Sequence, residues 1–164
     1  MRGKALADTT FYAQDPTAAS ERRKRQGLEA VFVGVARQGG LRGEISLGRG
    51  NVDHIVVGQG GIFTIETKSH RGRISLARLD RRWLKQAYAE RKLIEQITGM
   101  KVEALLTFSE AWLVGKVPAQ LEGVTVLPAR MLAWYLSRRR PVMSAQETAE
   151  IGEALCLALE ADGG

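Results

Sequence analysis

The chain has 164 residues, of which 45% are hydrophobic and 26% charged, the composition of an ordinary soluble globular protein with enough residues to bury a core. One cysteine and two histidines exclude an internal disulfide and argue against zinc catalysis with several imidazole ligands. The formal charge of +6 favours a polyanionic partner, nucleic acid first.

The two ends of the chain carry few signals. The first residues, MRGKALADTT, lack the apolar stretch of a signal peptide, and no apolar run approaches the roughly 18 residues of a membrane span. We therefore expect a cytoplasmic protein. Residues 1–14 have no clear period and are interpreted as a disordered N-terminal arm, followed by a single domain over residues 15–162.

A helix is predicted from Pro16 to Gly34, because Asp15 is a candidate N-cap and proline suits the first helical position. The next segments alternate short apolar runs with glycine-rich turns, one of them SHRG after Lys68. Strands are expected at residues 44–47, 52–57, 62–67 and 73–76.

The second half of the chain contains three helical patterns. Apolar residues recur at helical spacing over residues 83–98, with Gly99 as the stop, and over residues 129–140 before a proline. SAQE at residues 144–147 is a capping box for a last helix. Strands are predicted at residues 101–108, near 111–115 and at 123–128, and the three tryptophans are expected in core or edge packing.

This order of elements indicates an α/β or α+β domain with a mixed sheet covered on both faces. The strands at 52–57 and 62–67 form a hairpin around Gly58–Gly61, with Val57 opposite Ile62. In that register Asp53 lies opposite Glu66, and Lys68 joins the same face two residues later.

Two carboxylates in opposed positions destabilise a sheet unless something positive lies between them, because opposed Cβ atoms are about 4.5–5.5 Å apart. Mg²⁺ prefers carboxylate oxygens and keeps several waters, so a cation site is one interpretation. The other is that Asp53 and Glu66 are edge charges that pair with nearby arginines. A register slip of one residue would also separate them.

An aspartate on one strand and Glu-x-Lys on the next is the signature of the PD-(D/E)xK nuclease superfamily. The segment GNVDHIVVGQGGIFTIETKSHRGRI more narrowly resembles the core motif of the nuclease-related domain (NERD) family. That family typically shows an Asn-Ile-Asp-His hairpin, a glycine-rich turn and Ile-Glu-Thr-Lys followed by glycine. The resemblance covers Ala18 to Ala87 and implies a restriction-endonuclease-like core, a mixed central sheet flanked by helices on both faces.

The resemblance also implies roles for individual residues. Asp53 and Glu66 would hold Mg²⁺ or Mn²⁺ with the Thr67 carbonyl, and Lys68 would position the attacking water. Gln86, early in the next helix, would orient water or phosphate. Glu21 matches a glutamate of the first helix, although Ser20 replaces the usual glycine before it.

A basic segment follows the hairpin and is expected to guide the phosphate backbone without reading bases. Its candidate contacts are His70, Arg71, Arg73, Arg81, Arg82 and Lys85. We therefore expect a metal-dependent nuclease-like domain that hydrolyses phosphodiester bonds, with DNA as the expected substrate. The alternative is a non-cleaving nucleic-acid-binding or assembly module on the same fold. A homodimer or a DNA-processing partner protein is compatible with either.

Overall fold

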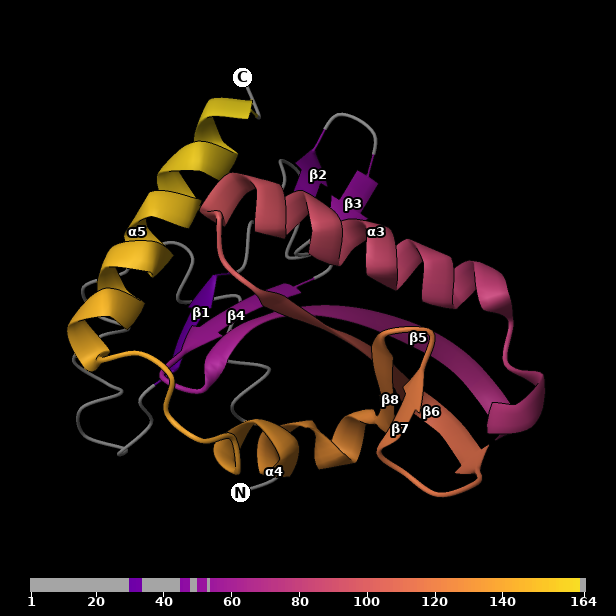
Figure 1. The fold of residues 1–164 in the computed structure, drawn as a ribbon. Helices are drawn as coiled ribbons and strands as arrows, with labels where there is room; N and C mark the ends of the chain where they lie inside the picture. The colour runs from indigo at the N-terminus through magenta and orange to yellow at the C-terminus, as the bar shows by residue number, and fades with distance from the viewer. Residues whose placement is uncertain (1–29, 34–44, 48–49, 53, 163–164) are drawn as a thin grey trace.

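The computed structural model describes residues 30–33, 45–47, 50–52 and 54–162. Its centre is a mixed sheet, with helices on both faces (Figure 1). This confirms the predicted fold class. The strands are β1 (Ala30–Val33), β2 (Ile45–Leu47), β3 (Gly50–Val52), β4 (His54–Gly58), β5 (Gly61–Ser75), β6 (Val102–Val114), β7 (Ala119–Leu121) and β8 (Val124–Pro128). The helices are η1 (Leu76–Arg78), α3 (Arg81–Thr98), η2 (Ala129–Met131), α4 (Leu132–Ser137) and α5 (Ala145–Asp162).

Six strands form the main sheet in the order β1-β4-β5-β6-β8-β7. β1, β4 and β5 are antiparallel neighbours, whereas β5, β6 and β8 run parallel, and β7 returns antiparallel along β8. Parallel strands cannot be joined by a tight turn, so α3 provides the crossover from β5 to β6. β2 and β3 pair separately.

The predicted hairpin register is confirmed over the described residues of β4 and β5. Val57 pairs with Ile62, and the pairing continues to His54 opposite Ile65. Consecutive residues of both strands are buried, so both faces of the hairpin are covered and specify the register, and Gly61, with φ of 133°, permits the turn. Asp53 lies outside the described residues, so its position opposite Glu66 stays a prediction.

Several predicted boundaries are wrong. The helix expected to reach Gly34 is replaced by β1 over Ala30–Val33. The turn predicted at SHRG does not form, because β5 continues through it to Ser75 while paired with β6, with a register shift between Lys68 and Arg71. The two strands expected near residues 101–115 are one strand, β6, and the helix after Pro128 ends at Ser137.

The core has a layer on each face of the sheet. α3 and α5 cover one face, where their leucines and isoleucines pack against β4, β5 and β6, and α4 covers the opposite face through Leu132 (Figure 1). Trp83 packs on the α3 side as expected. Trp112 and Trp134 do not pack in the core: they are 61% and 47% exposed. No helix among the described residues is long and apolar enough to cross a membrane.

Candidate active site

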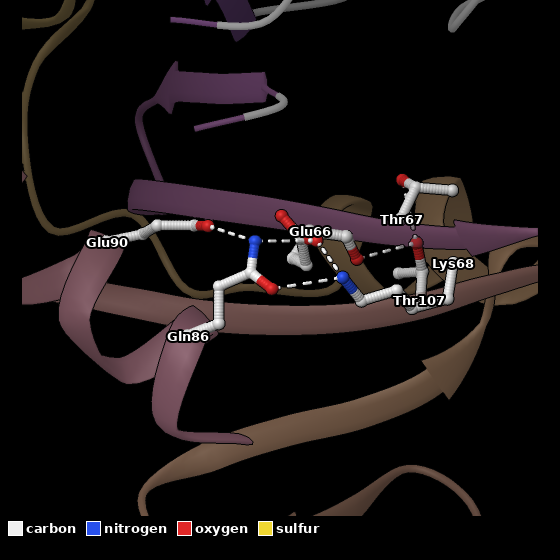
Figure 2. A network of polar contacts seen from close by, with 6 residues as sticks. All are labelled: Glu66, Thr67, Lys68, Gln86, Glu90 and Thr107. Carbon is white, nitrogen blue, oxygen red and sulfur yellow. Dashed lines mark hydrogen bonds and ion pairs between the residues drawn. The ribbon is translucent and has the colours of Figure 1, made fainter. Parts of the chain in front are cut away.

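β5 presents the two chemical side chains of the Glu-x-Lys motif to the same face of the sheet. Glu66 is the register partner of Leu106, and Lys68 is the partner of Phe108; both partners belong to the cluster packed under α3. The side chains of Glu66 and Lys68 therefore point toward that helix (Figure 2). Glu66 is only 3% exposed, whereas the Lys68 side chain is 18% exposed. The motif thus combines a buried acid with a partly accessible amine.

α3 carries the other half of the site. The helix begins at Asp80, whose carboxylate accepts a hydrogen bond from the Arg82 backbone N–H at 2.9 Å. The hydrogen bond from the Arg82 side chain lowers the Asp80 pKa, and the backbone bond adds to this. Gln86 and Glu90 follow one turn apart on the same side of the helix.

The Gln86 amide joins the two elements. Its carbonyl accepts from Lys68 Nζ at 3.1 Å, and its Nε2 donates to Glu66 Oε1 and to Glu90 Oε1, each at 3.1 Å (Figure 2). Lys68 Nζ also donates to Glu66 Oε1. Both N–H groups of the amide and one acceptor site of its oxygen are engaged, which fixes both the Gln86 amide and the Lys68 amine.

Two buried carboxylates lie at the centre of this cluster. Glu66 and Glu90 are both 3% exposed. Lys68 Nζ donates to Glu66, and the Gln86 amide nitrogen donates to both acids. Burying a carboxylate is costly unless it is hydrogen-bonded or paired with a cation, so these contacts help to hold the two acids in the interior.

The donor chemistry suits a hard divalent cation, since carboxylate oxygens are the ligands that Mg²⁺ prefers. The described residues contain no group of three or more histidines, cysteines or acids close enough to hold a metal. Glu66 and Glu90 are two carboxylates, and the predicted third, Asp53, lies outside those residues. The fit therefore rests on the oxygen chemistry of the carboxylate ligands.

Comparison with known families identifies the type of domain. The family model for the nuclease-related domain matches residues 23–117, more than half of the chain. The chain belongs to the nuclease-related domain family. No curated protein and no solved structure matched the chain. The match spans β1 to β6 and α3. It therefore includes Glu66, Lys68, Gln86 and Glu90, which together form the amide-centred cluster.

The nuclease-related domain also holds the backbone of β5 from its other face. Thr67 alternates with Glu66 and Lys68, and its hydroxyl lies 3.2 Å from the Thr107 hydroxyl of β6. Thr107 Oγ1 in turn donates to the Glu66 carbonyl oxygen at 3.4 Å. These contacts brace the strand directly behind the site. The predicted role of the Thr67 carbonyl as a metal ligand stays a prediction.

The predicted backbone-guiding residues do not form one surface. Arg71 and Arg73 alternate with Gly72 and Ile74, and Ile74 packs on the α3 side, so the two arginines lie on the opposite face from Lys68. His70 is exposed and meets the Trp83 ring edge-on at 4.5 Å between centroids.

Ion pairs occupy several of these cations. Arg71 Nε lies 2.5 Å from Glu110 Oε2, and Arg82 pairs with Asp80 at 2.8 Å. The Arg81 Nε donates to Glu122 at 2.7 Å. Lys85, in contrast, is exposed on α3 and makes no ion pair with the residues that the structure describes. Among the predicted nucleic-acid contacts, Lys85 is therefore the direct sequence neighbour of Gln86, and its charge is not shared with a described acid.

Glu90 is the residue of the cluster that sequence reasoning missed. Its signal is its position: it falls on the buried stripe of α3 with Leu84, Ala87 and Ile94. A charged residue on an apolar stripe is rarely buried without a partner, and here the partner lies one turn earlier, at Gln86. Glu21, predicted to assist the metal, lies outside both the described residues and the family match.

Proposed function

We propose that this nuclease-related domain is a metal-dependent nuclease that hydrolyses phosphodiester bonds, with DNA as its substrate. The observation that carries the proposal is the placement of Lys68. Its amine is held between the buried Glu66 carboxylate and the Gln86 carbonyl, in a network that includes a second buried acid, Glu90. Membership of a nuclease-related family supports the same reading.

Lys68 supplies the positive charge for the reaction. Its ammonium has three N–H groups, and the described residues engage two of them, through Glu66 and Gln86. The third is available to a phosphate oxygen or to the attacking water. A fixed donor aimed where negative charge develops typically contributes about 100- to 1,000-fold in rate.

The proposed cation is Mg²⁺ or Mn²⁺, held by Asp53, Glu66 and the Thr67 carbonyl. A bound divalent cation polarises the phosphoryl oxygen and lowers the pKa of a coordinated water. Glu21 adds an outer contact. Glu66 is a metal ligand in this scheme. The Gln86 amide is hydrogen-bonded to the Glu66 carboxylate and to the Lys68 amine, and so holds these two groups next to each other.

Glu90 acts as a positioning residue. It shares the Gln86 amide nitrogen with Glu66, so its carboxylate sets which way that amide faces. With the nitrogen turned toward two acids, the carbonyl is left for Lys68. An amide turned the other way would place its nitrogen against the ammonium and its oxygen against the acids, which is repulsive on both sides.

The test is plasmid cleavage by the full chain with Mg²⁺ or Mn²⁺, with and without chelator. We expect nicking that chelator abolishes and that Asp53→Ala or Lys68→Ala reduces at least about 100-fold. Lys101→Ala is the matched control, because Lys101 is exposed and forms no ion pair in the described part of the chain. Its activity should equal that of the wild type.

The same assay separates cleavage from mere binding. If the wild type and Asp53→Ala leave plasmid equally intact while still retarding it on a gel, the domain is a non-cleaving nucleic-acid module, and the nuclease proposal fails. A gain of nicking when a DNA-processing protein is added would assign the activity to an assembly. The substrate preference follows from repeating the assay with RNA of the same sequence.

A further inference from the structure

A second surface lies on the far side of the sheet from the candidate active site. Trp112 on β6 and Trp134 on α4 are 61% and 47% exposed, although a large indole is normally mostly covered. Ala111 and Leu113, the neighbours of Trp112, pack on the α3 side, so Trp112 points to the α4 side. Neither indole is explained by the core.

An arginine guanidinium lies over each of the two exposed indole rings. The Arg130 guanidinium lies 5.4 Å from the Trp112 ring centroid, and the Arg138 guanidinium lies 5.6 Å from that of Trp134. Both distances fall within the roughly 6 Å range of cation–π contacts. Arg73 is the register partner of Trp112 on β5 and is exposed on the same face.

The helical spacing joins these pairs into one surface. Arg130 in η2, Trp134 in α4 and Arg138, the residue that caps the end of α4, are spaced four residues apart, and all three are exposed. Leu132 is buried and Tyr135 is half-buried, which places them on the inner side of the same turns. We call the set Arg73, Trp112, Arg130, Trp134 and Arg138 the arginine–tryptophan face.

The charges on this face are uncompensated. None of its three arginines forms an ion pair with any residue that the structure describes, whereas Arg71, next to them on β5, is taken by Glu110. A guanidinium stacked on an indole keeps its full charge and its N–H edge for an outside acceptor. A polyanion satisfies three such cations at once.

We propose that the arginine–tryptophan face binds single-stranded nucleic acid. Exposed aromatic rings accept unpaired bases by stacking, and interleaved arginines contact the phosphates between them, which is the chemistry of sequence-tolerant single-strand binding. The chain's charge of +6 attracts the same ligand. The proposal goes beyond the proposed nuclease and does not rest on it, since no residue of the face belongs to the amide-centred cluster.

Tryptophan and arginine also concentrate in protein interfaces. Two observations favour nucleic acid here. The described part of the face offers three unshared positive charges, and the two carboxylates on the same side of β6, Glu103 and Glu110, are paired with Arg139 and Arg71. Trp112 and Trp134 each have an arginine guanidinium over the ring.

The experiment measures anisotropy of a labelled oligothymidylate of about 12 nucleotides with the full chain in chelator, so that nothing is cleaved. Stacking is tested with Trp112→Ala/Trp134→Ala, which should weaken binding at least about tenfold. Trp112→Phe/Trp134→Phe keeps two aromatic rings and should bind within about threefold of the wild type. Oligouridylate should behave like oligothymidylate, and a duplex of equal length should bind more weakly.

Phosphate contacts are tested with Arg130→Gln/Arg138→Gln, which should flatten the slope of log affinity against log salt by about 1.4. The control Lys92→Gln/Lys101→Gln also removes two positive charges, but from outside the arginine–tryptophan face. It should leave base stacking and the slope of log affinity against log salt largely unchanged. The proposal is overturned if the alanine pair binds like the wild type, which leaves the face to a protein partner. It is overturned equally if the lysine control loses as much affinity as the arginine pair.

The result is independent of catalysis. Trp112→Ala/Trp134→Ala should lose affinity for the oligonucleotide whether or not the wild type cleaves plasmid, because neither indole belongs to the Lys68 site. A nuclease with an inert arginine–tryptophan face, or an inactive domain with a binding face, would each be recognised from the two assays together.

Discussion

Replacing Glu90 with leucine should make the protein more stable and less active at once. Glu90 is 3% exposed on the stripe of α3 that also buries Leu84, Ala87 and Ile94. A leucine of similar size completes that stripe. The same change removes the carboxylate that orients the Gln86 amide against Lys68.

The expected gain in stability comes from four terms. A buried leucine side chain contributes about 2 kcal/mol relative to an exposed one, and the desolvation cost of a buried carboxylate, about 3 kcal/mol, is removed. Against these stand the lost hydrogen bond between Gln86 and a charged acceptor, about 1.5–3 kcal/mol, and the loss of the further polar contact that Glu90 makes, about 1 kcal/mol. Gln86 is exposed, so water can take the freed N–H. The net stabilisation should be about 1–2 kcal/mol, which raises Tm by about 2–8 °C for a chain of this length.

Thermal and urea unfolding of the wild type and Glu90→Leu give the first measurement, and plasmid cleavage gives the second. Glu153→Leu is the control, because Glu153 is exposed on α5 and the change should shift stability by less than about 0.5 kcal/mol. Glu90→Gln preserves the shape and removes the charge. A fall in Tm for Glu90→Leu would show that the carboxylate stabilises the fold through contacts stronger than Gln86, and the reasoning would be refuted.

Three further outcomes are expected. Gln86→Ala should reduce cleavage at least about tenfold with little change in Tm, because the side chain is exposed but joins the acids to Lys68. Hydrogen bonds from the Ser144 backbone and side chain lower the Glu147 pKa, so its contribution is present above the ordinary value of about 4.3 and is lost as pH falls through the lowered value. The Tm deficit of Glu147→Ala, measured by calorimetry, should therefore shrink on acidification below about pH 4; a pH-independent deficit would contradict this. Gly99→Ala should cost about 1 kcal/mol in urea unfolding, because φ is 65° and the added Cβ meets nothing within 4 Å, whereas Gly99→Asn should cost less.

The hairpin could be predicted because two local rules agree. Apolar runs in β4 and β5 predict two buried strands, and the glycines between them predict a short turn that sets the pairing. Gly99 as a left-handed helix stop and the Ser144–Glu147 capping box are equally local, and both are confirmed.

The errors arise where distant pairing overrides local preference. SHRG has the composition of a turn, yet parallel pairing with β6 draws residues 69–72 into one long strand, and Gly72 absorbs a φ of 82°. The segment ending at Gly34 was assigned to a helix, but Ala30–Val33 pair with β4. A single sequence does not show where the partner strand lies. The length of β5 and the strand at Ala30–Val33 could therefore not be predicted from the secondary-structure preferences of their residues.

The candidate site likewise has residues that local sequence patterns could predict and residues that depend on the tertiary structure. Glu66, Lys68 and Gln86 could be predicted, and the structure brings their side chains into one network. Glu90 was not predicted, because its role depends on which side of α3 meets the sheet. The exposure of Trp112 also depends on the tertiary structure. β6 continues to Val114, whereas its pairing with β8 ends at Phe108, so the last residues of β6 have no β8 residue beside them.

β5 separates the two proposed sites across the sheet. Alternation along the strand sends Glu66 and Lys68 to the α3 side and Arg73 to the α4 side, where its charge is unshared among the described residues. The proposed active site and the arginine–tryptophan face therefore lie on opposite faces of the same strands. Binding to the arginine–tryptophan face and turnover at the Lys68 site should then be separable by mutation, which a single basic active-site cleft would not permit.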